Sequence, residues 1–149
     1  MQATQPHIVA IQETCLHKDS KIQNFPNYDI IRVDRPNTIK ASGGIALLVM
    51  KHITYNVKKL TPYSNGKLEI QAITIKQRDK HIDIINIYDS HGNHKKDELN
   101  HYFNQINKNH IIVWDFHGHY PIWEPTKNPI PNTCGRTTAK FLDIMRILA

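Results

Sequence analysis

Residues 7–14 read His-Ile-Val-Ala-Ile-Gln-Glu-Thr, a short apolar run that stops abruptly at Glu13 and Thr14. A continuous apolar run of this length, bounded by polar residues, is typical of a buried β-strand. The first residue after the run is acidic. The stretch therefore predicts a strand that presents a carboxylate at its end.

Six further stretches along the chain have the character of strands. Two of them, 53–60 and 68–75, alternate apolar and polar residues and are separated by the turn signal at 62–66, which predicts a hairpin. The others are mainly apolar or bounded by turn signals. The six stretches are 28–33, 43–50, 53–60, 68–75, 82–88 and 111–114.

Two stretches in the second half have helical spacing. Residues 96–106 place Leu99, Tyr102 and Phe103 on one face, with acidic residues near the start. A second helical pattern begins at about residue 137. Seven strands and two helices predict an α/β domain with a core formed largely by two sheets.

Length and composition limit the class of protein. The chain has 149 residues and predicts one domain, and its formal net charge of +6 favours a polyanionic partner, although scattered surface lysines of an ordinary soluble protein would give the same value. No apolar run approaches the ~20 residues that span a bilayer, and the N-terminus lacks the pattern of a signal peptide. The isolated Cys15 and Cys134 suggest reduced thiols in an intracellular setting, without a disulfide framework or structural zinc site.

Three strand ends carry groups suited to hydrolytic chemistry. Glu13 follows the first strand, Asp115 follows 111–114, and Tyr88 closes 82–88. We expect side chains at such strand ends to converge at one rim of a sheet. Two carboxylates together with a substrate phosphate would suffice for a hard cation such as Mg²⁺, although each group alone is also explained as a solvated strand terminus.

Four segments, in the same order along the chain, resemble the endonuclease/exonuclease/phosphatase superfamily. More narrowly, they are similar to the apurinic-like endonuclease domain of insect non-LTR retrotransposons of the jockey and R1 types. The loop 132–136 that leads to Phe141 resembles a segment of the same subgroup. The four segments are 6–14, 43–49, 84–88 and 115–119, the last with Trp123.

The resemblance implies a four-layer α/β-sandwich, two mostly antiparallel sheets flanked by helices, of which residues 1–149 would form an incomplete domain truncated at both ends. It implies an endonuclease that nicks DNA with Mg²⁺ or Mn²⁺, with no small-molecule cofactor and no membrane partner. Glu13 and Asp115 would be metal ligands, Tyr88 would contact the scissile phosphate, and Asp115 would orient or deprotonate the attacking water. The protein would be intracellular, and nuclear if it is part of a retroelement protein with an associated reverse transcriptase.

The segment around Asp115 departs from the family motif Gly-Asp-x-Asn. Trp114 stands in place of Gly, and His117 occupies the catalytic position of Asn. An amide donates and accepts hydrogen bonds at once, whereas each imidazole nitrogen does one of the two. We therefore expect this chain to be a poor or inactive catalyst.

Two alternatives remain open from the residues. The first is a catalytically inactive remnant of a retroelement that keeps weak, non-specific affinity for nucleic acid. The second is a calcineurin-like metallophosphoesterase, because Asp115-x-His117 and Gly92-Asn93-His94 resemble segments of that family, although in reversed order. His117 and His119 could also form an adventitious transition-metal site, but exposed loop histidines are more common than ligands.

Overall fold

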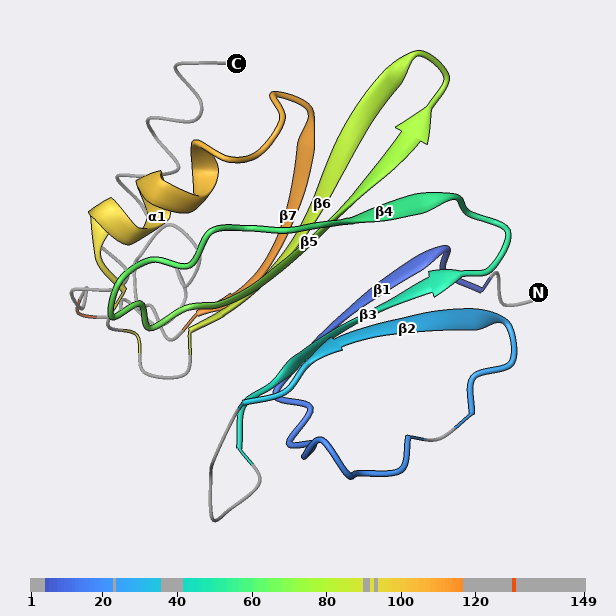
Figure 1. Cartoon of the computed structure of the whole chain (residues 1–149), viewed down its shortest axis with the longest axis horizontal. Helices are drawn as coiled ribbons and strands as arrows, with labels where there is room; N and C mark the ends of the chain where they lie inside the picture. The colour runs from blue at the N-terminus through green and yellow to red at the C-terminus, as the bar shows by residue number, and fades with distance from the viewer. Residues whose placement is uncertain are drawn as a thin grey trace. The chain divides into compact units, whose positions relative to one another are not determined.

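Seven strands and one helix are present in the part of the chain that a computed structural model describes, namely residues 5–22, 24–35, 42–89, 92, 94–116 and 130 (Figure 1). The strands form a three-stranded sheet of order β1-β3-β2 and a four-stranded sheet of order β4-β5-β6-β7. The elements are β1 Ile8–Gln12, β2 Tyr28–Val33, β3 Ile45–Met50, β4 Tyr55–Lys58, β5 Glu69–Gln77, β6 Lys80–Asp89, α1 Lys96–Phe103 and β7 His110–Phe116.

The three-stranded sheet is built around β3, the most apolar of the predicted strands. β1 and β2 pair with it antiparallel, with Ala10 and Ile31 both opposite Leu47. The first five residues of β3 are buried, whereas β1 and β2 are mostly half-buried. A continuous apolar run thus marks the central strand of this sheet, because that strand is covered on both sides.

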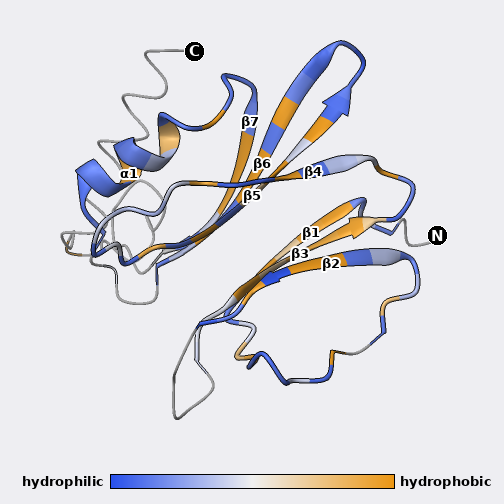
Figure 2. Cartoon of the chain, in the orientation of Figure 1, coloured by the Kyte–Doolittle hydropathy of each residue, from blue (hydrophilic) through white to orange (hydrophobic). Residues whose placement is uncertain are grey.

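The four-stranded sheet confirms the predicted hairpin, since β4 pairs antiparallel with β5. It also contains a second hairpin, in which β5 and β6 pair from Glu69 opposite Tyr88 to Gln77 opposite Lys80. Both strands therefore run further than their apolar patterns. The hydrophilic end of this hairpin, visible in Figure 2, is held by ladder hydrogen bonds and carries no apolar signal of its own.

The core lies between the two sheets, where Leu47 and Val49 of β3 pack against Ile73 of β5 and Ile84 of β6. Residues two apart on a strand share a face, so Gln71 and Glu69 continue the row that contains Ile73. On β6 the same row runs from Ile84 to Asn86 and Tyr88. The layer between the sheets is thus apolar in the middle and becomes polar toward one end of β5 and β6.

Asn86 connects the two sheets at this polar end. Its side chain is fully buried, and its Nδ2 donates to the carbonyl oxygens of Ile11 and Ala46, each at 3.0 Å. Its Oδ1 accepts a bond of 2.6 Å from Nε2 of Gln12. One side chain of the four-stranded sheet is therefore bonded to two strands of the other sheet.

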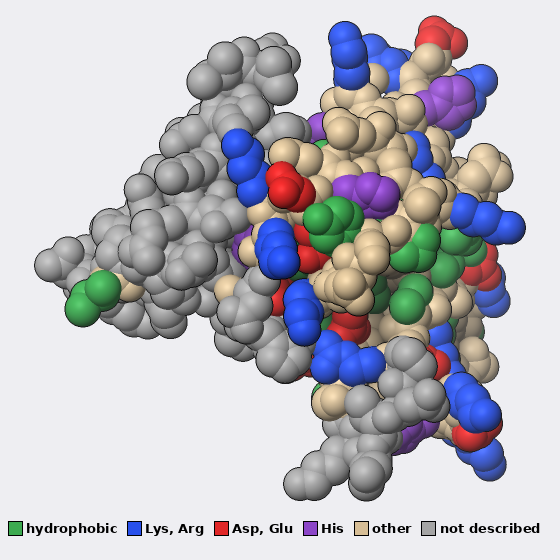
Figure 3. Space-filling view, turned by 60° about the vertical axis from the view of Figure 1, so that its left-hand side comes forward, with side chains coloured by type: hydrophobic (Ala, Val, Ile, Leu, Met, Phe, Trp, Pro, Cys, Tyr) green, Lys and Arg blue, Asp and Glu red, His purple; other side chains and the backbone are tan. Residues whose placement is uncertain are grey.

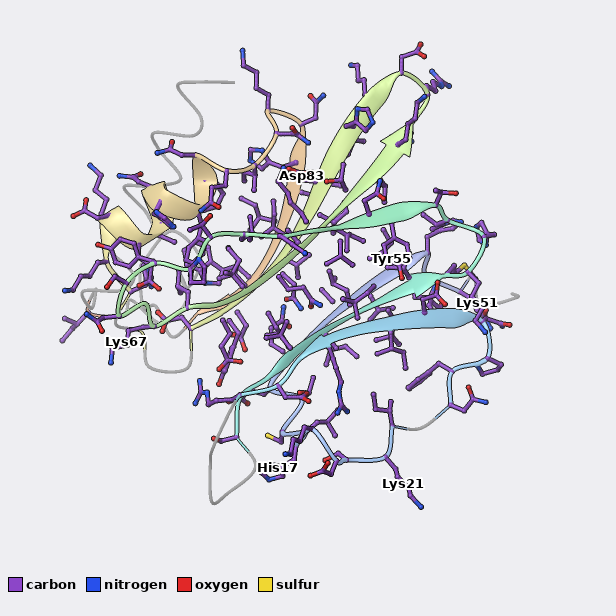
Figure 4. The ribbon with its side chains drawn as sticks, in the orientation of Figure 1. His17, Lys21, Lys51, Tyr55, Lys67 and Asp83 are labelled. Atoms are coloured by element: carbon purple, nitrogen blue, oxygen red, sulfur yellow. The ribbon has the colours of Figure 1, made fainter. Side chains whose placement is uncertain are left out.

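Asp83 is a second buried polar group, on β6 (Figure 4), and its carboxylate is saturated with donors. Nζ of Lys58 lies at 2.7 Å, Oγ1 of Thr74 at 2.6 Å, and the backbone N–H and Nδ2 of Asn107 at 2.7 and 2.9 Å. Burial by itself raises the pKa of the Asp83 carboxyl, but the hydrogen bonds from these three residues outweigh it and lower the pKa.

We expect Asp83→Asn to lower the free energy of unfolding near neutral pH by about 2 kcal/mol, because hydrogen bonds to a charged group are replaced by weaker ones. Since the folded-state pKa lies below the unfolded value of about 3.9, the stabilisation is complete above that pH and is lost as the pH falls through the folded pKa. Thermal melts between pH 3 and pH 7 would show a shallower acid dependence for the variant. Asp79→Asn, at the exposed tip of the β5–β6 hairpin, is the control and leaves the melting curve unchanged.

The chain divides into two compact units, and both sheets lie almost entirely in the first, which comprises residues 1–60, 69–88 and 106–114. The second unit contains α1 and the loop 61–68. Glu98 of α1 is buried, and its Oε1 accepts the backbone N–H groups of Lys67 and Leu68 at 2.7 and 2.9 Å. That carboxylate anchors the loop to the helix.

The helix is shorter than predicted, ending at Phe103 rather than near 106. The second predicted helix lies outside the described residues. No helix in the described ranges is long and apolar enough to cross a membrane. The expectation of one domain over residues 1–149 stays a prediction.

Candidate active site

Glu13 lies on a β-bulge. Gln12 pairs with Ile45, so a regular ladder would place Glu13 opposite Gly44. Instead the N–H of Thr14 donates to the Gly44 carbonyl at 3.0 Å, which leaves Glu13, the residue directly after β1, as an extra residue relative to the ladder. Its φ of 52° lies in the left-handed region, which costs a non-glycine residue about 1–2 kcal/mol.

The bulge directs Glu13 toward Tyr88. The Tyr88 side chain is 2% exposed, and its hydroxyl donates to Oε1 of Glu13 across 75 positions of sequence. The strand-end pattern predicted that these two residues would converge, and the structure brings them together. Their roles in catalysis stay predictions.

Asp115 differs from its predicted place. The sequence pattern ended the strand at Trp114, but β7 continues to Phe116, so Asp115 lies inside the strand rather than after it. An aromatic residue after Asp115 favours extended backbone, and strand ends are set by hydrogen-bond pairing as well as by apolar pattern. The side chain of Asp115 is exposed. His117, His119 and Trp123 lie outside the described residues.

Two charged residues that the sequence analysis did not select form an ion pair next to Tyr88 and the turn before β3. Glu69 is the residue opposite Tyr88 in the β5–β6 ladder, and its Oε1 accepts a hydrogen bond from Nη2 of Arg35. Its Oε2 accepts the backbone N–H of Gly44 at 2.6 Å. A signal was present in the sequence: Glu69 is in phase with Ile73 and Ile75, which places a charge on the face of β5 that packs into the core.

The turn formed by Gly43 and Gly44 allows these contacts. Both residues have positive φ, 65° and 83°. A Cβ at Gly43 would lie 2.5 Å from Oε1 of Glu69, and one at Gly44 would lie 2.5 Å from Oγ1 of Thr14. The two glycines are therefore required both for the backbone conformation and for the close approach of the neighbouring side chains.

The oxygen ligands at this site are of the type that a hard divalent cation prefers, but few of them lie close together. Glu13 is exposed, and a carboxylate that accepts the Tyr88 hydroxyl at one oxygen still has a second oxygen for a cation. Within the described ranges no group of three or more His, Cys, Asp or Glu side chains is placed to hold a metal ion. Glu13 is the residue here that would hold Mg²⁺ or Mn²⁺, with water and substrate supplying other ligands.

One segment of the metallophosphoesterase alternative is partly described. His94 is buried, and its Nδ1 lies 2.6 Å from Oδ2 of Asp89, which also accepts the N–H of Gly92 through its other oxygen. Asp89 thus bonds to both described residues nearest the end of β6, Gly92 and His94. Asn93 and His117 lie outside the described residues, and the alternative stays a prediction.

Comparisons with known proteins define the fold. No protein-family model matches the chain, and no curated protein sequence matches it. Among solved structures, the human Nocturnin catalytic domain with bound sulfate anion is similar, with a TM-score of 0.51 and 14% sequence identity over 83% of this chain. The chain spans 56% of the length of that structure. The predicted α/β-sandwich of two mostly antiparallel sheets is confirmed, and the chain shares the fold of that catalytic domain.

Proposed function

We propose that this chain forms part of a metal-dependent endonuclease that hydrolyses DNA phosphodiester bonds. The observation that carries the proposal is the bulge that turns an exposed carboxylate, Glu13, onto the hydroxyl of the buried Tyr88. Left-handed backbone at a non-glycine residue persists where the surrounding structure enforces it, and such positions cluster at functional sites. The fold shared with a catalytic domain that holds a sulfate, a tetrahedral oxyanion like phosphate, supports the same chemistry.

Four residues of this chain would each have a role in the reaction. Glu13 would hold the cation. Tyr88, whose one hydroxyl proton is donated to Glu13, would orient that carboxylate and contact the scissile phosphate. Asp115 would accept a proton from the attacking water, and His117 would donate to a phosphate oxygen. When bound, Mg²⁺ or Mn²⁺ would polarise the phosphoryl oxygen and offset its developing charge.

DNA is the proposed partner because the net charge of the chain is +6. Figure 3 shows Lys and Arg side chains spread over the visible face among acidic and histidine side chains rather than gathered in one block. Such a distribution supports weak binding to phosphates without selection of a base sequence. The resemblance of four segments to non-LTR retrotransposon endonucleases supports that type, and a nuclear location would follow from it.

Nicking of supercoiled plasmid tests the proposal. We expect slow conversion to the open circle with Mg²⁺ or Mn²⁺ over hours at micromolar protein, and none in EDTA. Asp115→Asn, purified identically, is the control for a contaminating nuclease and has to lack the activity. Conversion that persists in EDTA, or that does not exceed the control with either metal, would overturn the proposal.

A further inference from the structure

Glu69 is bonded to two groups at the edge of the candidate site. Its side chain is 14% exposed, and the Arg35 side chain that pairs with it is 25% exposed. Oε1 of Glu69 accepts from Arg35, while Oε2 accepts the Gly44 N–H at 2.6 Å. The short bond from a backbone N–H to a carboxylate is charge-assisted and stronger than a neutral one.

The segment that Glu69 holds is the one that pairs with the bulge at Glu13. The Gly44 carbonyl accepts the N–H of Thr14 at 3.0 Å, and the Gly43 carbonyl accepts the N–H of Cys15 at 2.8 Å. These two hydrogen bonds lie immediately after Glu13 and define the register shift that creates the bulge. Glu69 therefore fixes the turn against which Glu13 acquires its left-handed conformation.

Glu69 is also linked to Glu13 through the four-stranded sheet. Tyr88, which bonds to Glu13, is the direct partner of Glu69 in the β5–β6 ladder. Side chains opposite each other in an antiparallel pair lie on the same face. Glu69 and Tyr88 thus leave the sheet side by side, Glu69 bonding to the turn before β3 and Tyr88 to Glu13, the residue after β1.

We propose that Glu69 is a positioning residue, which holds Glu13 against Tyr88 through the Gly43–Gly44 turn and thereby sets the affinity of Glu13 for a divalent cation. The inference rests on the proposed function for the role of Glu13 as a cation ligand. The part of the inference that concerns the position of Glu13 rests on the hydrogen bonds alone. Groups that orient metal ligands typically change metal affinity or activity by 10–100-fold when removed.

Three variants separate the two contacts of Glu69. Glu69→Ala removes both, Glu69→Gln keeps an oxygen acceptor for the Gly44 N–H, and Arg35→Gln removes the ion pair while leaving the carboxylate in place. Backbone amide hydrogen exchange is measured by NMR for all three. We expect exchange at Thr14 and Cys15 to accelerate at least ~10-fold in Glu69→Ala, with Leu47 and Val49 in the core unchanged, and to remain near wild type in the other two.

Binding of Mn²⁺ alone, followed by paramagnetic broadening, supplies the second readout. We expect Glu69→Ala to bind at least ~10-fold more weakly than wild type and Glu69→Gln to recover most of the loss. Unchanged exchange at Thr14 and Cys15, equal acceleration in the core, or a Glu69→Gln variant as impaired as Glu69→Ala would overturn the positioning role. A wild-type chain that binds no Mn²⁺ would instead refute the proposed function and the effect of Glu69 on cation affinity. The exchange data would still test whether Glu69 positions the Gly43–Gly44 turn.

Discussion

Glu13→Gly is expected to lower the rate of phosphodiester cleavage by at least about 100-fold and, at the same time, to change the free energy of unfolding by less than about 1 kcal/mol. The loss of rate follows from removing the carboxylate that faces Tyr88. The small effect on stability follows because two changes oppose each other. Glycine adopts the φ of 52° at this bulge without the steric penalty that Glu13 bears, whereas the buried Tyr88 hydroxyl loses its hydrogen bond to the carboxylate. Plasmid nicking and urea unfolding of the same preparation measure the two effects.

Arg78→Gly is the matched control for this experiment. Arg78 has a φ of 55° and lies exposed in the turn between β5 and β6, without a place in the proposed site. It should raise the free energy of unfolding by about 1 kcal/mol, because glycine relieves the positive φ, and leave the nicking rate unchanged. If Glu13→Gly keeps full activity, or if both variants lose activity, Glu13 does not have the catalytic role proposed for it.

Asn86→Leu is expected to lower the free energy of unfolding by about 3 kcal/mol, the largest effect on stability that we predict for a single substitution. The reason is that leucine has a similar volume but leaves the Ile11 and Ala46 carbonyls and the Gln12 amide without their donor or acceptor inside the core. Urea unfolding followed by tryptophan fluorescence and circular dichroism measures the change. Coincident transitions by the two probes would show that the chain still unfolds in one step.

The neighbouring Gln71 provides the contrast. It lies opposite Asn86 in the ladder and is 4% exposed, but neither atom of its amide has a hydrogen-bond partner among the described residues. Removing a buried polar group that has no partner is neutral or stabilising, so Gln71→Leu should raise stability by up to about 1 kcal/mol. Equal destabilisation by both substitutions would mean that side-chain packing at this layer, rather than the hydrogen bonds of Asn86, holds the two sheets together.

Most of the strands could be predicted from local pattern. The bounds of β2 are those of the apolar run 28–33, and β1 and β3 differ from theirs by one or two residues. β3 is buried and β1 and β2 are half-buried, and the apolar content of each run reflects that burial. The polar ends of β5 and β6 were missed because their pairing satisfies backbone groups without burying apolar side chains.

The candidate site was predicted only in part, because its members were chosen one strand end at a time. Glu13 and Tyr88 each terminate an apolar run, and that local feature sufficed to select them. Glu69 and Arg35 were missed because each resembles an ordinary surface charge until its partner is known. Glu69 lies on the same face of β5 as Ile73 and Ile75. Its charge indicates a special role only once that face is known to point into the core.

The amino-acid sequence by itself determined which segments become strands, because the alternation and apolar content of each segment act over a few residues. Tertiary structure alone decided that Glu13, directly after β1, is an extra residue relative to the ladder. A bulge exists only relative to the partner segment, in which the Gly44 carbonyl accepts the N–H of Thr14 instead. It also decided that Asn86 joins the sheets and that Glu69 accepts a hydrogen bond from the turn before β3. These contacts join residues 25 to 75 positions apart, and their geometry depends on the packing of two sheets rather than on the preference of any one segment.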